Sequence, residues 1–393
     1  MFGSSKKPRA SFNLALDIGN GSIGGALFEV VSGEPRVFYS ARDPVAFQEN
    51  LTVERLTAGM LSTLKSSVAL VEKYYSGLSA ARELKNIGVF FSSPWHSSET
   101  KVLTLDLTIP TVITKTMIEK LIATEDAVFR GHVARDGGKG KQPSLLERMT
   151  MGFRLNGYPT AKPYGQKATE VSAVMFESLV SRKIRDTVRH VLERLHPTGT
   201  LSYYAFPAAA QVVLRELSGL SQFVTVRIGG EVTDVMLVRD GVLAATATFP
   251  TGRNSLERKL KRFYATHPHC ALASLIALRR DSAIGTKDSA IVDEALRSTK
   301  QAWLDSLRKV CADFSRGGFL PRTVFVFEEE GAHSPFPDWL AETPSELFGR
   351  NEPITVTMLD RNSASFFVGH EIQKEPDVAL AIEAAFMASG FAL

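Results

Sequence analysis

A glycine-rich segment near the N-terminus constrains the fold more than any other feature. It follows an apolar run that ends at Asp17, and its residues Gly19, Gly21 and Gly24 formally match the dinucleotide-binding fingerprint G-x-G-x-x-G. That fingerprint requires a helix directly after the loop. Residues 26–31 are instead rich in valine and phenylalanine, and a cluster of turn residues follows them. The pattern therefore predicts a strand, a glycine turn and a second strand.

A hairpin of this kind contains the parts of a phosphate-binding site. Glycines let backbone N–H groups approach phosphate oxygens closely, and a hydroxyl such as that of Ser22 can donate to them. The carboxylate of Asp17 can hold hydrated Mg²⁺ at the end of the strand. A purely structural turn is the alternative interpretation, so the hairpin alone does not decide the function.

A second segment of the same design lies 210 positions further along the chain. Residues 223–228 form a β-type run that leads into Gly229 and Gly230, and another β-type run begins at Thr233. Two matching hairpins predict a duplicated architecture in which each half offers one loop to a shared ligand.

Length and composition agree with two lobes. The chain has 393 residues, 44% of them hydrophobic, which is enough to form more than one core. A net charge of +4 is small for this size and argues against a nucleic-acid-binding protein. The only cysteines, Cys270 and Cys311, suggest no disulfide framework and favour a reducing cytoplasm. The sequence shows no signal peptide and no run of about 18 to 20 apolar residues that would span a membrane.

The paired hairpins resemble those of the actin-like ATPase superfamily, whose two phosphate loops close on ATP from opposite lobes. Between the hairpins, an Asn-Gly turn at 156–157 and a Pro-x-Gly turn at 163–165 precede a β-type run. This block is similar to subdomain 1C, an SHS2-type domain, of the group that contains the cell-division protein FtsA and the type IV pilus protein PilM. Alanine-rich segments at 201–210 and 375–385 resemble the two connecting helices of the superfamily.

The resemblance implies an α/β chain with the actin-like, ribonuclease H-like duplicated two-lobe fold and an inserted small α+β subdomain. The expected parts are the first lobe with its phosphate hairpin at 11–94, the inserted 1C subdomain at 95–182, the return to the first lobe with a connecting helix at 183–218, the second lobe with its phosphate hairpin at 219–361, and the C-terminal connecting helix at 362–393.

The resemblance also implies which residues would contact ATP and Mg²⁺. Asp17 is the expected metal ligand, and Asp17 and Asp234 are the acids that remain for catalysis, whose residues are otherwise unknown. The expected nucleotide-binding set is Asp17, Gly19, Asn20, Gly21, Ser22, Gly229, Gly230, Thr233 and Gly331.

Two departures from the family pattern argue against efficient hydrolysis. The second hairpin carries Arg227 where an acid is expected, and a guanidinium can neither ligate a metal nor act as a base. Glu328–Glu330 stand where glycine backbone should approach adenosine, which brings like charge near phosphate. The sequence therefore predicts at most a weak ATPase in which binding of ATP and Mg²⁺ is an open question. Arg227 can itself supply the positive charge that Mg²⁺ brings to a phosphate.

The expected function is that of a cytoplasmic actin-like scaffold, peripheral at the inner membrane, in type IV pilus assembly or cell division. Residues 386–393 contain no lysine or arginine, unlike the basic amphipathic helix that anchors the division protein, so we expect recruitment by a membrane partner as in the pilus-type relative. The 1C-like block instead favours the division protein. Expected partners are proteins of a membrane-associated assembly and further copies of the chain in an oligomer or filament, with indirect membrane contact and no nucleic acid.

Two other functions stay open at this point. One is an active ATPase whose nucleotide state controls polymerisation. The other is a small-molecule kinase of the same superfamily, against which stand the 1C-like block and the lack of a recognisable sugar-binding acid.

Overall fold

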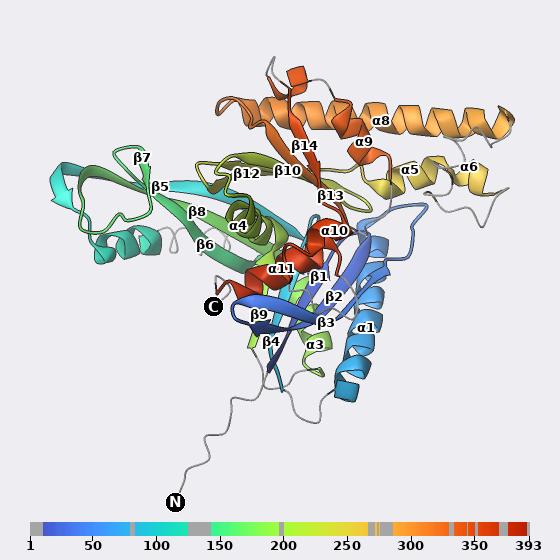
Figure 1. The fold of residues 1–393 in the computed structure, drawn as a ribbon, viewed down its shortest axis with the longest axis horizontal. Helices are drawn as coiled ribbons and strands as arrows, with labels where there is room; N and C mark the ends of the chain where they lie inside the picture. Colours follow the sequence, from blue (N-terminus) through green and yellow to red (C-terminus); the bar gives the residue numbers. More distant parts are fainter. Residues whose placement is uncertain are drawn as a thin grey trace, which may run out of the picture.

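The computed structural model describes residues 11–78, 83–124, 143–195, 200–265, 272, 275, 286–329, 334–343, 345–349, 353–368 and 376–390. These residues form two five-stranded sheets and one four-stranded sheet, with helices packed around them (Figure 1).

The first lobe is built on a sheet with the strand order β3-β2-β1-β4-β9. The first three strands are antiparallel neighbours, and the last two continue the sheet in parallel. The strands are β1 (Ser11–Ile18), β2 (Ser22–Val31), β3 (Glu34–Pro44), β4 (Glu83–Phe91) and β9 (Thr200–Ala205).

Helices α1 (Val53–Leu78) and α11 (Val378–Ala388) cover opposite faces of this sheet. Successive strand residues point to opposite faces, and a Cβ built on Gly25 of β2 would meet Val71 of α1, whereas one on Gly24 would meet Leu380 of α11. Burial on both faces explains why β1 is apolar along most of its length rather than alternating.

The second lobe repeats the same sheet. Its strand order, β12-β11-β10-β13-β14, and its strand directions match those of the first sheet one for one. The strands are β10 (Phe223–Ile228), β11 (Thr233–Arg239), β12 (Val242–Phe249), β13 (Thr323–Glu328) and β14 (Thr355–Met358). The predicted duplicated two-lobe α/β fold is therefore confirmed.

The third sheet is formed by residues that lie between β4 and β9 in the sequence, and it projects from the side of the lobes (Figure 1). It is antiparallel with the order β5-β8-β6-β7. Residues 115–124 form a helix, and Ile118 within it shares a small core with Val171. The strands are β5 (His96–Val112), β6 (Pro143–Leu155), β7 (Tyr158–Thr160) and β8 (Lys167–Ser181).

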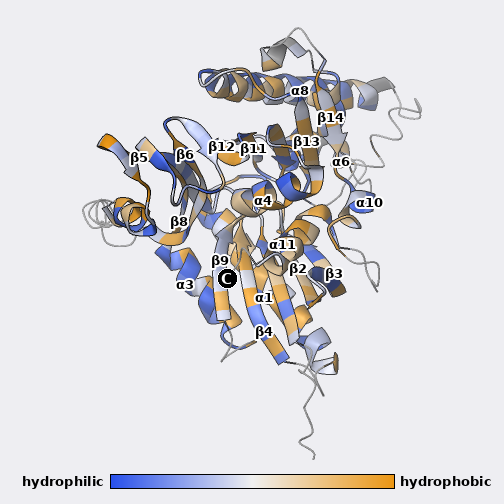
Figure 2. Ribbon diagram, turned by 60° about the vertical axis from the view of Figure 1, so that its left-hand side comes forward, coloured by the Kyte–Doolittle hydropathy of each residue, from blue (hydrophilic) through white to orange (hydrophobic). Residues whose placement is uncertain are grey.

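The remaining helices complete the lobes. Hydrophobic residues gather in the strands of the lobes, whereas α8 is hydrophilic over much of its length (Figure 2). Among the described residues, no helix has both the length and the apolar character needed to span a membrane. These helices are α3 (Arg182–Leu192), α4 (Phe206–Ser218), α5 (Arg253–Lys259), α6 (Lys261–Tyr264), α8 (Thr286–Ser315), α9 (Phe336–Ala341), η1 (Ser345–Phe348) and α10 (Arg361–Ala364).

The segment 201–210, predicted to be the first connecting helix, is divided between two elements. Its first half is strand β9, because Tyr203 and Tyr204 suit a half-buried sheet. The helix α4 begins only at Phe206, with Pro207 in its first turn, where the missing N–H costs no hydrogen bond.

Candidate functional site

The two glycine hairpins meet at the junction of the lobes. A Cβ built on Gly21 would lie 2.7 Å from the Cα of Gly230, and one built on Gly230 would lie 2.5 Å from the Cα of Gly21. Both positions therefore require glycine, because any side chain would push the two backbones apart. The strands β1 and β10 approach this junction in equivalent registers, which places Asp17 of the first lobe next to Arg227 of the second.

Asp17 is fully buried between two arginines. Its Oδ2 lies 2.8 Å from Nη2 of Arg227 and 2.8 Å from Nη2 of Arg42, which belongs to β3. Burial alone would raise the pKa of Asp17, but the charges of Arg227 and Arg42 outweigh it and hold the pKa below its usual value. The carboxylate is ionised, and two guanidinium groups already compensate its charge.

Arg227 is only 1% exposed and has contacts from both lobes. Besides Asp17, its guanidinium contacts the Ser92 hydroxyl and lies over the ring of Phe206, 4.1 Å from the ring centre. Burial lowers its pKa, but the charges of Asp17 and Glu329 dominate and raise it above the usual value. A permanent positive charge therefore stands next to the carboxylate predicted to bind Mg²⁺.

Arg42 connects Asp17 to the start of α11. Its Nε lies 2.7 Å and its Nη2 lies 3.1 Å from the two carboxylate oxygens of Asp377, a bidentate pair. Asp377 also caps α11 by accepting a hydrogen bond from the N–H of Leu380 at 3.0 Å. The Nη1 of Arg42 donates to the hydroxyl of Ser22, so this predicted phosphate ligand is bound to an arginine.

The carboxylate of Glu329 lies between the two hairpins. The residue directly follows β13 and is 3% exposed. Its Oε2 accepts hydrogen bonds from the backbone N–H groups of Gly21 and Gly230, each at 3.1 Å. Its Oε1 is 1.4 Å from the point where a Cβ of Gly19 would lie. Backbone N–H groups of such turns are the donors that hold phosphate in nucleotide-binding loops, so a carboxylate occupies the anion position.

The other predicted nucleotide ligands serve the junction or the second lobe. Asn20 accepts hydrogen bonds from the N–H of Glu231 at 2.5 Å and of Val232 at 3.4 Å, and its Nδ2 donates to the carbonyl of Ser93 at 2.8 Å. The hydroxyl of Thr233 donates to Thr251 and accepts from Trp303. Asp234 accepts from Thr248 at 2.6 Å.

The structure thus gathers most of the predicted set at one point. The residues that meet at the junction are Asp17, Gly19, Asn20, Gly21, Ser22, Gly229 and Gly230. Thr233 and Asp234 form the hydrogen bonds given above within the second lobe, while Gly331 and Glu330 lie outside the described residues. Whether any of these residues binds nucleotide stays a prediction.

Sequence reasoning missed the roles of Arg42, Asp377 and Glu329. In the structure, Glu329 occupies the same place in the second lobe as Ser92 in the first. The N–H of Ser92 donates to the carbonyl of Ile18 at 3.1 Å, and that of Glu329 donates to Ile228 at 3.0 Å. The sequence pattern predicts a charge that repels phosphate, whereas the carboxylate itself accepts the hydrogen bonds of the two hairpins.

The side chains present do not fit a magnesium–nucleotide complex in this arrangement. The expected metal ligand is paired with two guanidinium groups, and the expected phosphate donors bind a carboxylate. In the part of the chain that the structure describes, no group of three or more metal-ligating side chains has a geometry suited to a metal ion.

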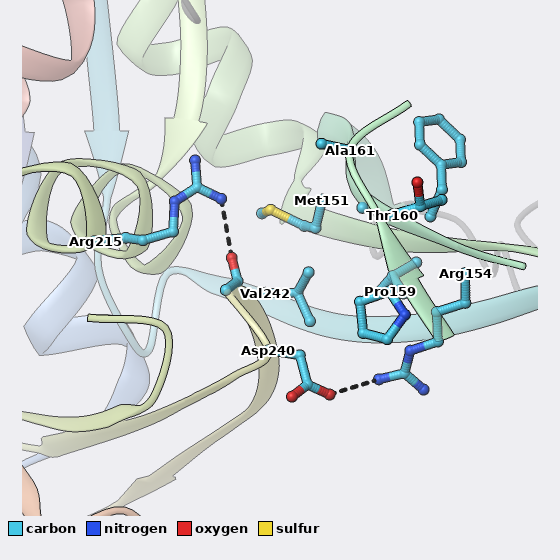
Figure 3. A pocket seen from close by; sticks show the side chains of 12 residues that line it. Met151, Arg154, Pro159, Thr160, Ala161, Arg215, Asp240 and Val242 are labelled. Carbon is cyan, nitrogen blue, oxygen red and sulfur yellow. Dashed lines mark hydrogen bonds and ion pairs between the residues drawn. The ribbon is translucent and has the colours of Figure 1, made fainter. Parts of the chain in front are cut away.

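A cavity of about 260 Å³ lies away from this junction (Figure 3). It is lined by β6, β7, the turn between β11 and β12, and α4. At its rim Arg154 Nη2 lies 3.3 Å from Asp240 Oδ2, and Arg215 donates to the carbonyl of Gly241 at 3.0 Å (Figure 3). The cavity therefore lies beside the contact between the third sheet and the turn of the second lobe, and none of its lining residues belongs to the hairpin site.

Comparison with known proteins gives structural matches alone, because no family model and no curated protein sequence matches the chain. A structure described as a "PilM-PilN type IV pilus biogenesis complex" has a TM-score of 0.57 and 16% identity, over 97% of this chain and 99% of that chain. The ethanolamine utilization protein EutJ from Carboxydothermus hydrogenoformans has a TM-score of 0.45, 13% identity and coverages of 98% and 91%. MreB 5 of Spiroplasma citri, bound to AMPPNP, has a TM-score of 0.41, 8% identity and coverages of 96% and 95%.

Of these three matches, the one to the pilus biogenesis complex supports the fold assignment, because it extends over nearly the whole of both chains at a TM-score above one half. Together with the repeated sheet topology, it establishes the architecture. The chain therefore has the two-lobe actin-like fold.

Proposed function

We propose that this chain is an actin-like scaffold protein that does not hydrolyse ATP and acts in a membrane-associated assembly of the PilM type. The observation that carries the proposal is the ion pair between Asp17 and Arg227, at 2.8 Å in a fully buried setting. It joins the two positions where the family pattern expects a pair of acids.

The chemistry of the junction supports the absence of hydrolysis. Attack of water on a phosphoryl group needs a positioned metal and a group that orients or deprotonates the water. Arg227 can do neither, and Asp17 would have to give up two charge-assisted contacts before it could bind a cation. This argument disfavours the two alternatives, an active ATPase and a small-molecule kinase, since both need the metal.

The likeness in fold supports the proposed location and partners. The PilM structure is a complex with PilN in pilus biogenesis. By that likeness we assign this chain to the cytoplasmic face of the inner membrane, held there by a protein partner. We also assign the four-stranded sheet of β5, β6, β7 and β8 to the inserted 1C subdomain expected at 95–182. The two five-stranded sheets are then the sheets of the two lobes.

Co-purification tests the assembly. The chain, tagged in its native cells, is expected to remain with the membrane fraction and to co-purify with membrane proteins of pilus assembly. Recovery with division proteins would assign it to the other role of this fold group, and recovery in the soluble fraction without a membrane protein would contradict the proposal.

A steady-state ATPase assay tests the chemistry separately. Wild type and a matched Arg154→Asp control, which loses only an exposed ion pair outside the hairpin site, are both expected to show no Mg²⁺-dependent turnover above a protein-free blank. An Arg227→Asp variant tested alongside shows whether this one departure accounts for the loss. Mg²⁺-dependent turnover by wild type above that blank would contradict a non-hydrolysing scaffold.

A further inference from the structure

We infer that the chain carries an internal substitute for a magnesium–nucleotide complex: the Glu329 carboxylate replaces a phosphate group and the Arg227 guanidinium replaces the cation, and together they hold the lobes closed without a ligand. The inference rests on the proposed function and explains how a scaffold of this fold can keep one conformation without ATP.

The anion half of the substitute is defined by its donors. Gly21 belongs to the first hairpin and Gly230 to the second, and both donate to the same oxygen, Oε2 of Glu329, at 3.1 Å. A phosphate group bound between two such turns would receive the same kind of backbone hydrogen bonds. One carboxylate oxygen therefore joins the two lobes in the manner of a bridging ligand.

The cation half lies on the other side of the same carboxylate. Nη2 of Arg227 is 2.8 Å from Asp17 and 3.7 Å from Oε1 of Glu329. The guanidinium thus stands between the carboxylate of the first lobe and the substituted anion, which is the electrostatic place of a metal ion between a protein carboxylate and a phosphate. All three side chains are buried, at 0%, 1% and 3% exposure for Asp17, Arg227 and Glu329, so solvent screens these charges little.

The close approach of the hairpins shows that the substitute is compatible only with closed lobes. Gly21 and Gly230 are in backbone contact, and the carboxylate fills the remaining space beside Gly19. Other contacts across the junction act in the same direction: Asn20 accepts from Glu231, Arg258 donates to the carbonyl of Gln48 at 3.0 Å, and Lys261 pairs with Glu49 at 2.5 Å. A nucleotide can enter only after Glu329 leaves.

The inference predicts a gain of binding when the substitute is removed in steps. In Glu329→Gly the anion position is empty and Arg227 remains, so ATP should bind with a dissociation constant below about 1 mM and with no requirement for Mg²⁺. In the double variant Arg227→Asp/Glu329→Gly the cation substitute is absent as well, so binding of ATP should require Mg²⁺. Calorimetric titration with ATP, in Mg²⁺ and in EDTA, measures both.

Two controls make the test specific. Glu328→Gln changes the neighbouring carboxylate, which contacts Ser334 rather than the hairpins, and should leave the chain without affinity for ATP. Glu329→Gln keeps the shape of the side chain but removes its charge. Hydrogen–deuterium exchange of peptides spanning the two hairpins should then accelerate by roughly ten-fold or more, because charge-assisted hydrogen bonds to Gly21 and Gly230 are weakened.

The outcomes separate this inference from the proposed function. If wild type and Glu329→Gly both fail to bind ATP while Glu329→Gln exchanges at the wild-type rate, the internal substitute is wrong and the scaffold proposal stands. If Glu329→Gly does not fold, the exchange of Glu329→Gln decides alone. If wild type itself binds ATP, both the substitute and the nucleotide-independent scaffold are contradicted.

Discussion

At the scale of single residues, the junction is a group of buried charges that compensate one another. Asp17 and Asp377 face Arg42, and Asp17 and Glu329 face Arg227. The fully buried Glu383 of α11 lies near them, and burial followed by the charge of Asp17 raises its pKa well above the usual value. The charged form of Glu383 is therefore disfavoured in the folded chain.

Neutralising Asp17 should destabilise the protein strongly. Asp17→Asn removes the charged partner that two buried guanidinium groups share, and breaking a buried ion pair in this way costs about 3–5 kcal/mol. The free energy of unfolding in urea measures this loss. The control Asp240→Asn breaks an exposed ion pair with Arg154 and should cost about 1 kcal/mol or less, so equal losses in the two variants would refute the buried group of charges.

A second buried carboxyl group should make stability depend on pH. Burial raises the pKa of Glu147 from 4.5 to about 8, although hydrogen bonds from Ala205 and Ser178 oppose the shift. Between these values the folded chain binds more protons than the unfolded one, so the free energy of unfolding falls as the pH rises, by at most about 1.4 kcal/mol per pH unit. The full contribution is present below pH 4.5 and is lost above about 8.

Glu147→Gln tests this dependence, because an amide oxygen can still accept from the N–H of Ala205 but does not titrate. Urea unfolding at pH 5 and at pH 8.5 should show the variant gaining stability relative to wild type at the higher pH. Identical differences at the two pH values would show that Glu147 keeps an ordinary pKa.

Single residues were only partly predictable from sequence. Arg227 stood out because it breaks a family pattern, and its proposed role as a substitute for a metal charge agrees with its position next to Asp17. Arg42 and Asp377 gave no such signal, since their pairing joins positions 335 residues apart. A side chain that acts through a distant partner cannot be identified from its local sequence.

At the scale of the elements, the two hairpins can come into backbone contact because glycine occupies the point of closest approach on each. Gly21→Ala would place a Cβ 2.7 Å from a backbone atom of Gly230, and backbone cannot move away without separating the lobes. The variant should lose about 1–3 kcal/mol of stability, as overpacked sites do. Gly77→Ala in α1, where nothing lies within 4 Å of an added Cβ, should instead gain up to about 1 kcal/mol.

Thermal or urea unfolding of the two glycine variants measures the difference. If Gly21→Ala unfolds like wild type, the two hairpins do not approach each other this closely in solution.

The strands around the hairpins were predictable because their apolar runs end at turn residues, whereas the border between β9 and α4 was not. At this border, tyrosines that favour a strand are followed directly by alanines that favour a helix. The pairing of β9 with β4, which ends at Ala205, determines where the strand stops.

At the scale of the whole molecule, the duplicated fold was predictable because two hairpins repeat in one chain and each defines a sheet. The closed arrangement of the lobes was not, because it depends on contacts such as that between Gly21 and Glu329, 308 positions apart. The meeting of the two hairpins was predictable from the sequence, but the Glu329 carboxylate between them was not.

Lobe closure can be tested at Asn20, which bridges the first hairpin to Glu231 and Ser93. Asn20→Ala leaves these backbone groups unbonded at the junction, so hydrogen–deuterium exchange of peptides covering 229–233 should accelerate by roughly three- to ten-fold. The surface variant Asn362→Ala, whose exposed side chain donates to Asp360 in the cap of α10, should exchange as wild type does. Unchanged exchange in Asn20→Ala would mean that other contacts suffice to close the lobes.

The central claim is that the chain's own carboxylate and guanidinium occupy the nucleotide position of an actin-like fold. Calorimetric titration of the wild-type chain with ATP, once with Mg²⁺ and once with EDTA, tests it most directly. The account predicts no binding heat in either buffer up to about 1 mM ATP. A saturable heat with a micromolar dissociation constant would contradict it.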